Sequence, residues 1–282
     1  MSLISTVSFG LIAKKILNDQ NRFHPVALGS AMFILIGISF FIVYLTQGVL
    51  ASDIRSLLDP KVITLLALNL GVYTLSPTFY FRALQKLPIS IVTIVYSLTG
   101  LFALIVESVL GINMVGLLSS LTGSLLIIFS VILVYIKGSE VRLSRYTIMI
   151  LLASASYALA AVLDRQLLSH FSDVFYLAVT FMIPGILLLP LNLLSPKKII
   201  QPYRKKNLRL VVISALPIAL SFFFTFRAYH FGGTAGQVYS VLSLEAVITV
   251  IAAAIFLKER QDLILKTLAA IVAGLGVYLL AI

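Results

Sequence analysis

Two acidic residues lie inside long apolar stretches of the sequence, where ionised side chains are costly. Glu107 falls near the end of the stretch 88–111, and Glu245 falls near the middle of the stretch 233–257. A carboxyl group at membrane depth usually faces protein or water. Glu245 is the deeper acid, and we expect it to bind a proton, a cation or a substrate amine. A buried structural carboxylate, paired with Arg, Tyr or a helix end, is the alternative. Glu107 could bind a proton or a cation in the same way, unless it lies close enough to the helix end to reach headgroup water.

Hydroxyl, amide and aromatic side chains accompany these acids at helical spacing. Thr93, Tyr96, Ser97 and Glu107 follow the spacing i, i+3, i+4 and i+14, so they share one face of a helix. Central tyrosines could stack on a planar substrate or form hydrogen bonds with it. Asn69 lies one turn from Tyr73, where it adds an amide or clamps two helices together. The predicted cavity residues are Asn69, Tyr73, Thr93, Tyr96, Ser97, Tyr157, Gln237, Ser240 and Glu245.

Basic residues end several of the apolar stretches. Arg82 and Arg227 occupy equivalent places in two related segments, 79–83 and 224–228, which lie 145 residues apart. They could gate a pathway or attract an anion at its mouths, or they could snorkel toward lipid headgroups. Asp164 and Arg165 are adjacent at the end of another stretch, and we expect this pair to neutralise itself.

The elements that position these residues follow from the composition. Of 282 residues, 60% are hydrophobic and only 11% are charged, against about 25% in ordinary soluble domains. This excludes a water-soluble fold and indicates a bilayer protein. The apolar stretches have the length of spanning helices, not of the short alternating strands of a barrel. Ten such stretches are expected at 3–13, 25–49, 61–83, 88–111, 114–136, 146–168, 173–194, 208–230, 233–257 and 263–282.

The 145-residue offset indicates an internal repeat. Residues 1–138 and 139–282 then form two halves of five helices each, and an odd number of spans inverts the second half relative to the first. The sequence therefore predicts an all-α integral membrane protein, with ten transmembrane helices arranged as two inverted five-helix repeats around a central cavity.

The sequence resembles the EamA-type members of the drug/metabolite transporter superfamily. The resemblance covers almost the whole chain and rests on Phe79-Tyr80-Phe81-Arg82-Ala83-Leu84, Pro88-Ile89-Ser90-Ile91-Val92, Leu242-Ser243-Leu244-Glu245-Ala246-Val247, Leu257-Lys258-Glu259-Arg260 and Gly274-Leu275-Gly276-Val277. It implies alternating access through a cavity between the two halves. Helices one to four and six to nine would line this path, while helices five and ten would lie outside it.

The expected function is secondary or facilitative transport of a small metabolite, such as an amino acid, an amine or a related polar solute. A coupling proton or cation is an expected partner, and no cofactor is expected. Glu245 with the two mouth arginines would suit a zwitterion. A lipid or polyprenyl-carrier translocase is the alternative. An intramembrane enzyme is less favoured, because the chain has no Cys, no Walker A motif and no catalytic Ser or zinc motif.

Charge and small residues give further expectations. The bases neither form a groove-reading motif nor alternate with aromatics, so nucleic acid is not an expected partner. His24, His170 and His230 lack ligand spacing, so no metal site is expected.

Most bases lie in odd-numbered connections, which predicts a cytoplasmic position for these connections and places both termini outside the plasma (cell inner) membrane. The resemblance implies the opposite orientation. Small residues in 263–282 indicate packing within the chain or a homodimer.

Overall fold

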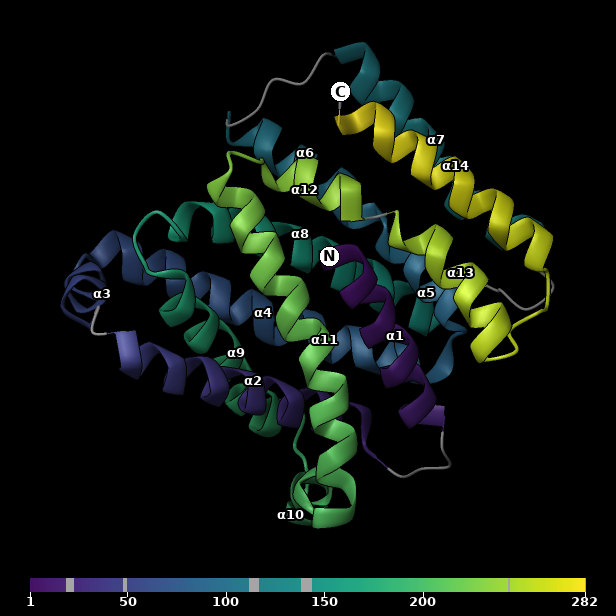
Figure 1. Cartoon of the computed structure of the whole chain (residues 1–282). Helices are drawn as coiled ribbons and strands as arrows, with labels where there is room; N and C mark the ends of the chain where they lie inside the picture. Colours follow the sequence, from purple (N-terminus) through teal and green to yellow (C-terminus); the bar gives the residue numbers. More distant parts are fainter. Residues whose placement is uncertain (19–22, 48–49, 112–116, 138–143, 243, 282) are drawn as a thin grey trace.

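The protein is described from a computed structural model that covers residues 1–18, 23–47, 50–111, 117–137, 144–242 and 244–281. Within these ranges every regular element is a helix (Figure 1). The ends of some expected apolar stretches, at 48–49, 114–116 and 282, lie outside the described residues. The helices are α1 (Ser2–Asn18), α2 (Pro25–Gln47), α3 (Leu50–Leu57), α4 (Pro60–Lys86), α5 (Ile89–Tyr96), α6 (Leu98–Val109), α7 (Leu117–Lys137), α8 (Arg145–Leu167), α9 (Asp173–Leu191), α10 (Pro196–Ile200), η1 (Gln201–Tyr203), α11 (Lys205–His230), α12 (Ala235–Leu242), α13 (Glu245–Phe256) and α14 (Leu263–Ala281).

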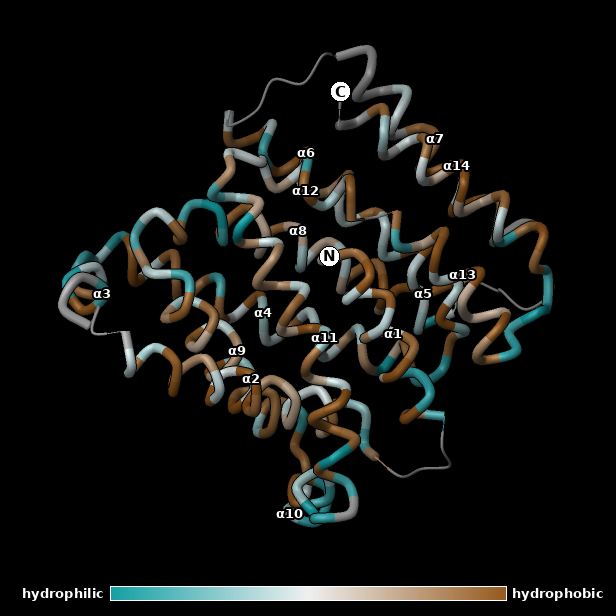
Figure 2. Tube along the Cα trace, viewed as in Figure 1, coloured by the Kyte–Doolittle hydropathy of each residue, from teal (hydrophilic) through white to brown (hydrophobic). Residues whose placement is uncertain are grey.

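Six segments of the described chain are long and apolar enough to cross a membrane. Each carries apolar residues along its length, while polar residues gather at helix ends and connections (Figure 2). Large apolar side chains such as Ile42, Leu216 and Ile255 are more than half exposed, as lipid-facing residues must be. The chain is therefore an integral membrane protein. The six segments are Pro25–Thr46, Pro60–Lys86, Ile89–Val109, Arg145–Leu167, Asp173–Leu191 and Asn207–His230.

The long helices pack in pairs that join distant parts of the sequence. Helix α2 packs on α9, α4 on α8, α1 on α11 and α7 on α14, and the last pair runs side by side in Figure 1. In α14, Ala269, Ala270 and Ala273 are fully buried within the chain. The small residues of this helix therefore serve internal packing, and a homodimer through the same helix stays a prediction.

The α2–α9 contact depends on glycine. A Cβ atom built on Gly37 would lie 2.5 Å from the backbone nitrogen of Met182, and one on Gly185 would lie 2.9 Å from the backbone nitrogen of Ile34. Backbone atoms cannot move aside as a flexible side chain can. Both glycines therefore set how closely the two helices approach.

Gly37→Leu is expected to lower the free energy of unfolding by about 1–3 kcal/mol, because overpacking forces the two helices apart. Unfolding by denaturant titration in detergent micelles measures this loss. Gly71→Leu is the matched control, since a Cβ atom at Gly71 would have no atom within 4 Å. Equal stability of the two variants would show that the α2–α9 contact tolerates a wider spacing.

Two expected helices are each broken near the middle. The stretch 88–111 forms α5 and α6 with a turn at Ser97, and the stretch 233–257 forms α12 and α13 with a turn at Leu244. The turns match in backbone angles, with φ −60° and ψ −18° at Ser97 and φ −60° and ψ −16° at Leu244. The hydroxyls of Thr93 and Ser97 bond to carbonyls one turn back, which bends a helix. Because of this break, Thr93 and Glu107 lie on two different helices and not on the single helix face that their spacing predicts.

Candidate substrate cavity

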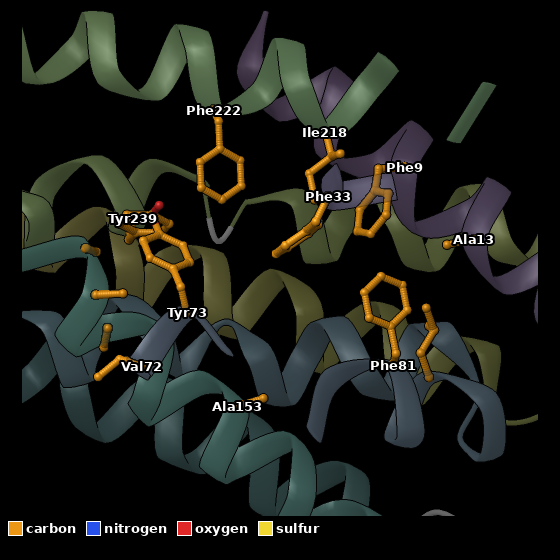
Figure 3. Close-up of a cluster of buried hydrophobic side chains, with 14 of the residues drawn as sticks. Phe9, Ala13, Phe33, Val72, Tyr73, Phe81, Ala153, Ile218, Phe222 and Tyr239 are labelled. Carbon is orange, nitrogen blue, oxygen red and sulfur yellow. The ribbon is translucent and has the colours of Figure 1, made fainter. Parts of the chain in front are cut away.

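A cavity lies among α1, α2, α4, α5, α6, α8, α11, α12 and α13. In Figure 3, Phe222 and Ile218 point into this region from α11, opposite Tyr73 and Phe81 of α4. The space open to the centre of a water molecule is about 90 Å³, which holds only a few waters. The lining residues are Thr6, Phe9, Phe33, Tyr73, Ser76, Pro77, Tyr80, Phe81, Tyr96, Ser97, Thr99, Tyr157, Ile218, Ser221, Phe222, Thr225, Tyr239, Leu242 and Glu245.

Five tyrosines contribute to the polar wall of this cavity. Tyr157 of α8 is in contact with three others: its ring centroid lies 6.0 Å from that of Tyr73, 5.7 Å from that of Tyr96 and 5.3 Å from that of Tyr239. The Tyr239 hydroxyl also donates to the Tyr157 hydroxyl at 3.0 Å. Such rings offer faces for a planar or cationic group and hydroxyls for hydrogen bonds.

Glu245 supplies the only charged side chain among the described residues that line the cavity. It lies in the first turn of α13, directly after the break, where the helix dipole favours a negative charge. Its side chain is 8% exposed, and its Oε2 atom is buried without a hydrogen-bond partner. A carboxyl group so placed must be neutral or be compensated by a cation. The site can therefore accept a proton or bind a cationic group.

Asp164 forms a second acidic centre behind the cavity wall. Both of its oxygens are used: Oδ2 accepts the hydroxyl of Tyr73, while Oδ1 accepts the Tyr176 hydroxyl at 2.7 Å and the Asn69 amide at 2.8 Å. Asp164 is fully buried, and its hydrogen-bond partners are neutral groups. This cluster holds Tyr73 in place on one wall of the cavity.

Two further carboxylates each cap the start of a broken helix in the opposite half of the chain. Glu107, at the end of α6, accepts the backbone N–H groups of Ala235 at 2.8 Å and Gly236 at 3.1 Å, at the start of α12. Glu259, just after α13, accepts those of Ile89 at 3.0 Å and Ser90 at 3.2 Å, at the start of α5. Free N–H groups at a helix start need such acceptors. Each carboxylate therefore caps a helix that is distant in sequence.

Comparison with known proteins decides the family. Residues 144–282 match the model of the EamA-like transporter family. The second half of the chain belongs to this family. Members of this family are membrane transporters of the drug/metabolite type.

Other comparisons bear on the fold of this EamA-like chain. No curated protein matches it. A protein of known crystal structure is similar to it with a TM-score of 0.64 and 16% sequence identity. That likeness covers 99% of this chain and 96% of the other, and it concerns the fold.

The EamA-like structure brings about half of the sequence-predicted cavity residues together. Tyr73, Tyr96, Ser97, Tyr157 and Glu245 line the cavity.

Three predicted cavity residues have contacts away from the cavity. Asn69 lies behind Tyr73 in the Asp164 cluster. The Thr93 hydroxyl is buried against the Ile89 carbonyl at 3.1 Å. Gln237 is exposed, and its side-chain oxygen accepts the backbone N–H of Thr234 at the start of α12. The side chain of Ser240 lies outside the described residues.

The three predicted coupling or gating residues other than Glu245 also lie outside the cavity. Glu107 caps α12, as described above. Arg82 donates to the side-chain oxygen of Asn192 at 2.7 Å, near the end of α9. Arg227 is exposed in the last turn of α11. The expected pairing of Asp164 with Arg165 is replaced by the cluster with Asn69 and the two tyrosines.

Proposed function

We propose that this protein is a secondary or facilitative transporter that moves a small amine or amino acid through the tyrosine-lined cavity by alternating access. The observation that carries the proposal is the carboxyl group of Glu245, which faces the cavity with one oxygen unpartnered. An ammonium group would supply the missing charge and hydrogen bonds, and the tyrosine rings would contribute cation–π contacts. In the absence of substrate, a proton on Glu245 serves the same purpose, which would couple transport to a proton gradient.

Helix pairing supports two inverted five-helix repeats as the framework of this movement. Exchanging the first half of the chain for the second leaves the α2–α9 and α7–α14 pairs unchanged and converts the α4–α8 pair into the α11–α1 pair. The two broken helices and their carboxylate caps exchange in the same way. The repeats would comprise residues 1–138 and 139–282. Their ten spans would be α1, α2, α4, α5 with α6, α7, α8, α9, α11, α12 with α13, and α14.

The lining chemistry favours a soluble amine over a lipid or polyprenyl carrier. Carriers of that kind bear phosphate, and phosphate sites use Arg or Lys. None of the described residues that line the cavity is basic. Membrane placement follows from charge: the odd-numbered connections would face the cytoplasm, with both termini outside the plasma membrane.

Glu245→Gln is expected to lower uptake of the amine or amino-acid substrate at least tenfold in proteoliposomes, because the amide keeps the shape but removes the charge. A panel of labelled amines, amino acids, sugars and nucleotides identifies the substrate. An inward proton gradient should stimulate uptake by the wild type and not by the variant. Asp59→Asn is the matched control: Asp59 is an exposed acid at the start of α4, and Asn caps a helix equally well.

Unchanged uptake by Glu245→Gln would contradict the proposal, provided that the variant unfolds at the same temperature as the wild type. Response of the wild type to polyprenyl phosphates alone would favour the carrier translocase instead.

A further inference from the structure

A second pocket lies apart from the central cavity, and its charged residues are all basic. Arg82 and Lys86 come from the end of α4, Arg145 from the start of α8 and Lys198 from α10, while His24 precedes α2. None of the described residues that line this pocket is acidic. The space open to the centre of a water molecule is about 480 Å³, several times that of the central cavity.

The contacts of two arginines fix their position without neutralising them. Arg82 donates to the neutral amide oxygen of Asn192 at 2.7 Å. Arg145 donates to the Tyr146 hydroxyl at 2.7 Å and lies 4.8 Å from the centre of that ring. Within the described part of the chain neither guanidinium group is paired with a carboxylate, and most of its donors are open to a ligand.

Two further features make this pocket suitable for an anion. Helices α2 and α8 both begin at residues that line it, Pro25 and Arg145, so the positive ends of two helix dipoles lie there. Burial lowers the pKa of His24 below its usual value, and the positive charges of Lys198 and Arg82 lower it further. The pocket is therefore a region of positive potential. The Nδ1 atom of His24 is also buried without a hydrogen-bond partner.

We propose that this basic pocket binds a phosphate group. Four cations from three separate helices converge on it, which suits a phosphate group because its oxygens accept several hydrogen bonds from Arg and Lys side chains. A membrane lipid or a soluble phosphate-bearing anion could supply this group. An apolar row beside the pocket favours the lipid, because Ile148 and Leu152 follow Arg145 at i+3 and i+7 on α8 and are 49% and 46% exposed. An acyl chain could lie along this row while its headgroup occupies the pocket.

The test measures binding to the delipidated protein in neutral detergent. Thermal unfolding is followed with phosphatidylglycerol, with phosphatidylcholine and with inorganic phosphate, and native mass spectrometry counts retained lipid. The test variant is Arg145→Gln with Lys198→Gln, two exposed residues of the pocket. The matched control is Lys197→Gln with Arg204→Gln, which removes two exposed bases near the pocket that do not line it.

We expect phosphatidylglycerol to stabilise the wild type and the control alike. The test variant should need at least a tenfold higher lipid concentration, and added salt should weaken binding. Stabilisation by inorganic phosphate, lost in the test variant, would also support the site and would name a soluble anion as its ligand. The proposal is overturned if neither ligand stabilises the wild type, or if the test and control variants lose binding equally.

Discussion

Asp164→Leu is expected to lower the free energy of unfolding by about 2–4 kcal/mol. The substitution removes the acceptor of three buried hydrogen bonds, from Asn69, Tyr73 and Tyr176. Hydrogen bonds between membrane helices average about 0.6 kcal/mol each, which sets the lower end. Two orphaned tyrosine hydroxyls, at about 2 kcal/mol each from the middle of the usual range, set the upper end. Denaturant titration in detergent micelles measures the change.

A second background separates the loss of the hydrogen bonds from the loss of packing. In a chain that carries both Tyr73→Phe and Tyr176→Phe, Asp164→Leu leaves only the Asn69 amide without its acceptor. The substitution should therefore lower the free energy of unfolding by at least about 1 kcal/mol less in this background than in the wild type. Asp164→Asn should cost least, because its amide oxygen still accepts a hydrogen bond. An equal cost of Asp164→Leu in both backgrounds would mean that the carboxylate contributes only its volume.

Glu107→Ala is expected to cost about 2–3 kcal/mol. The carboxylate of Glu107 is fully buried, and both of its oxygens accept backbone N–H groups at the start of α12. Its removal leaves these two groups unpaired in an apolar region and removes the negative charge that favours a helix start. Thermal unfolding in micelles gives the size of the loss, and Glu107→Gln should recover part of it through one amide oxygen.

Glu259→Ala is the internal comparison, since Glu259 caps α5 in the same manner. This carboxylate is only partly buried, so water can replace it at the N–H groups of Ile89 and Ser90. We expect a loss of about 1 kcal/mol, in the usual range for a helix cap. A larger loss for Glu259→Ala than for Glu107→Ala would contradict the argument from burial.

The sequence predicts the cavity best where a polar side chain interrupts an apolar run near its middle. Glu245, Tyr73, Tyr96 and Tyr157 satisfy this rule, and all four line the cavity. Gln237 follows the same helical spacing but lies in the first turn of α12, where its side chain bonds to the helix start. No residue type marks the break between α12 and α13. The sequence therefore predicts one continuous helix and does not indicate where its polar face ends.

Asp164 was missed because its neighbour Arg165 suggested a neutral pair. Adjacent residues on a helix point about 100° apart, so they do not face each other. That geometry places Asp164 and Arg165 on different sides of α8 and is the signal that could have identified the buried acid. Its three partners lie 12, 91 and 95 residues away, and no local spacing predicts such contacts.

The two carboxylate caps also decide when the chain can complete its structure during synthesis. Ile89 is joined to Glu259 across 170 residues, and Ala235 to Glu107 across 128. The start of α5 is therefore inserted long before the ribosome has made the group that satisfies its N–H donors. Until the last helices are inserted, the start of α5 therefore lacks the carboxylate that caps it in the finished protein.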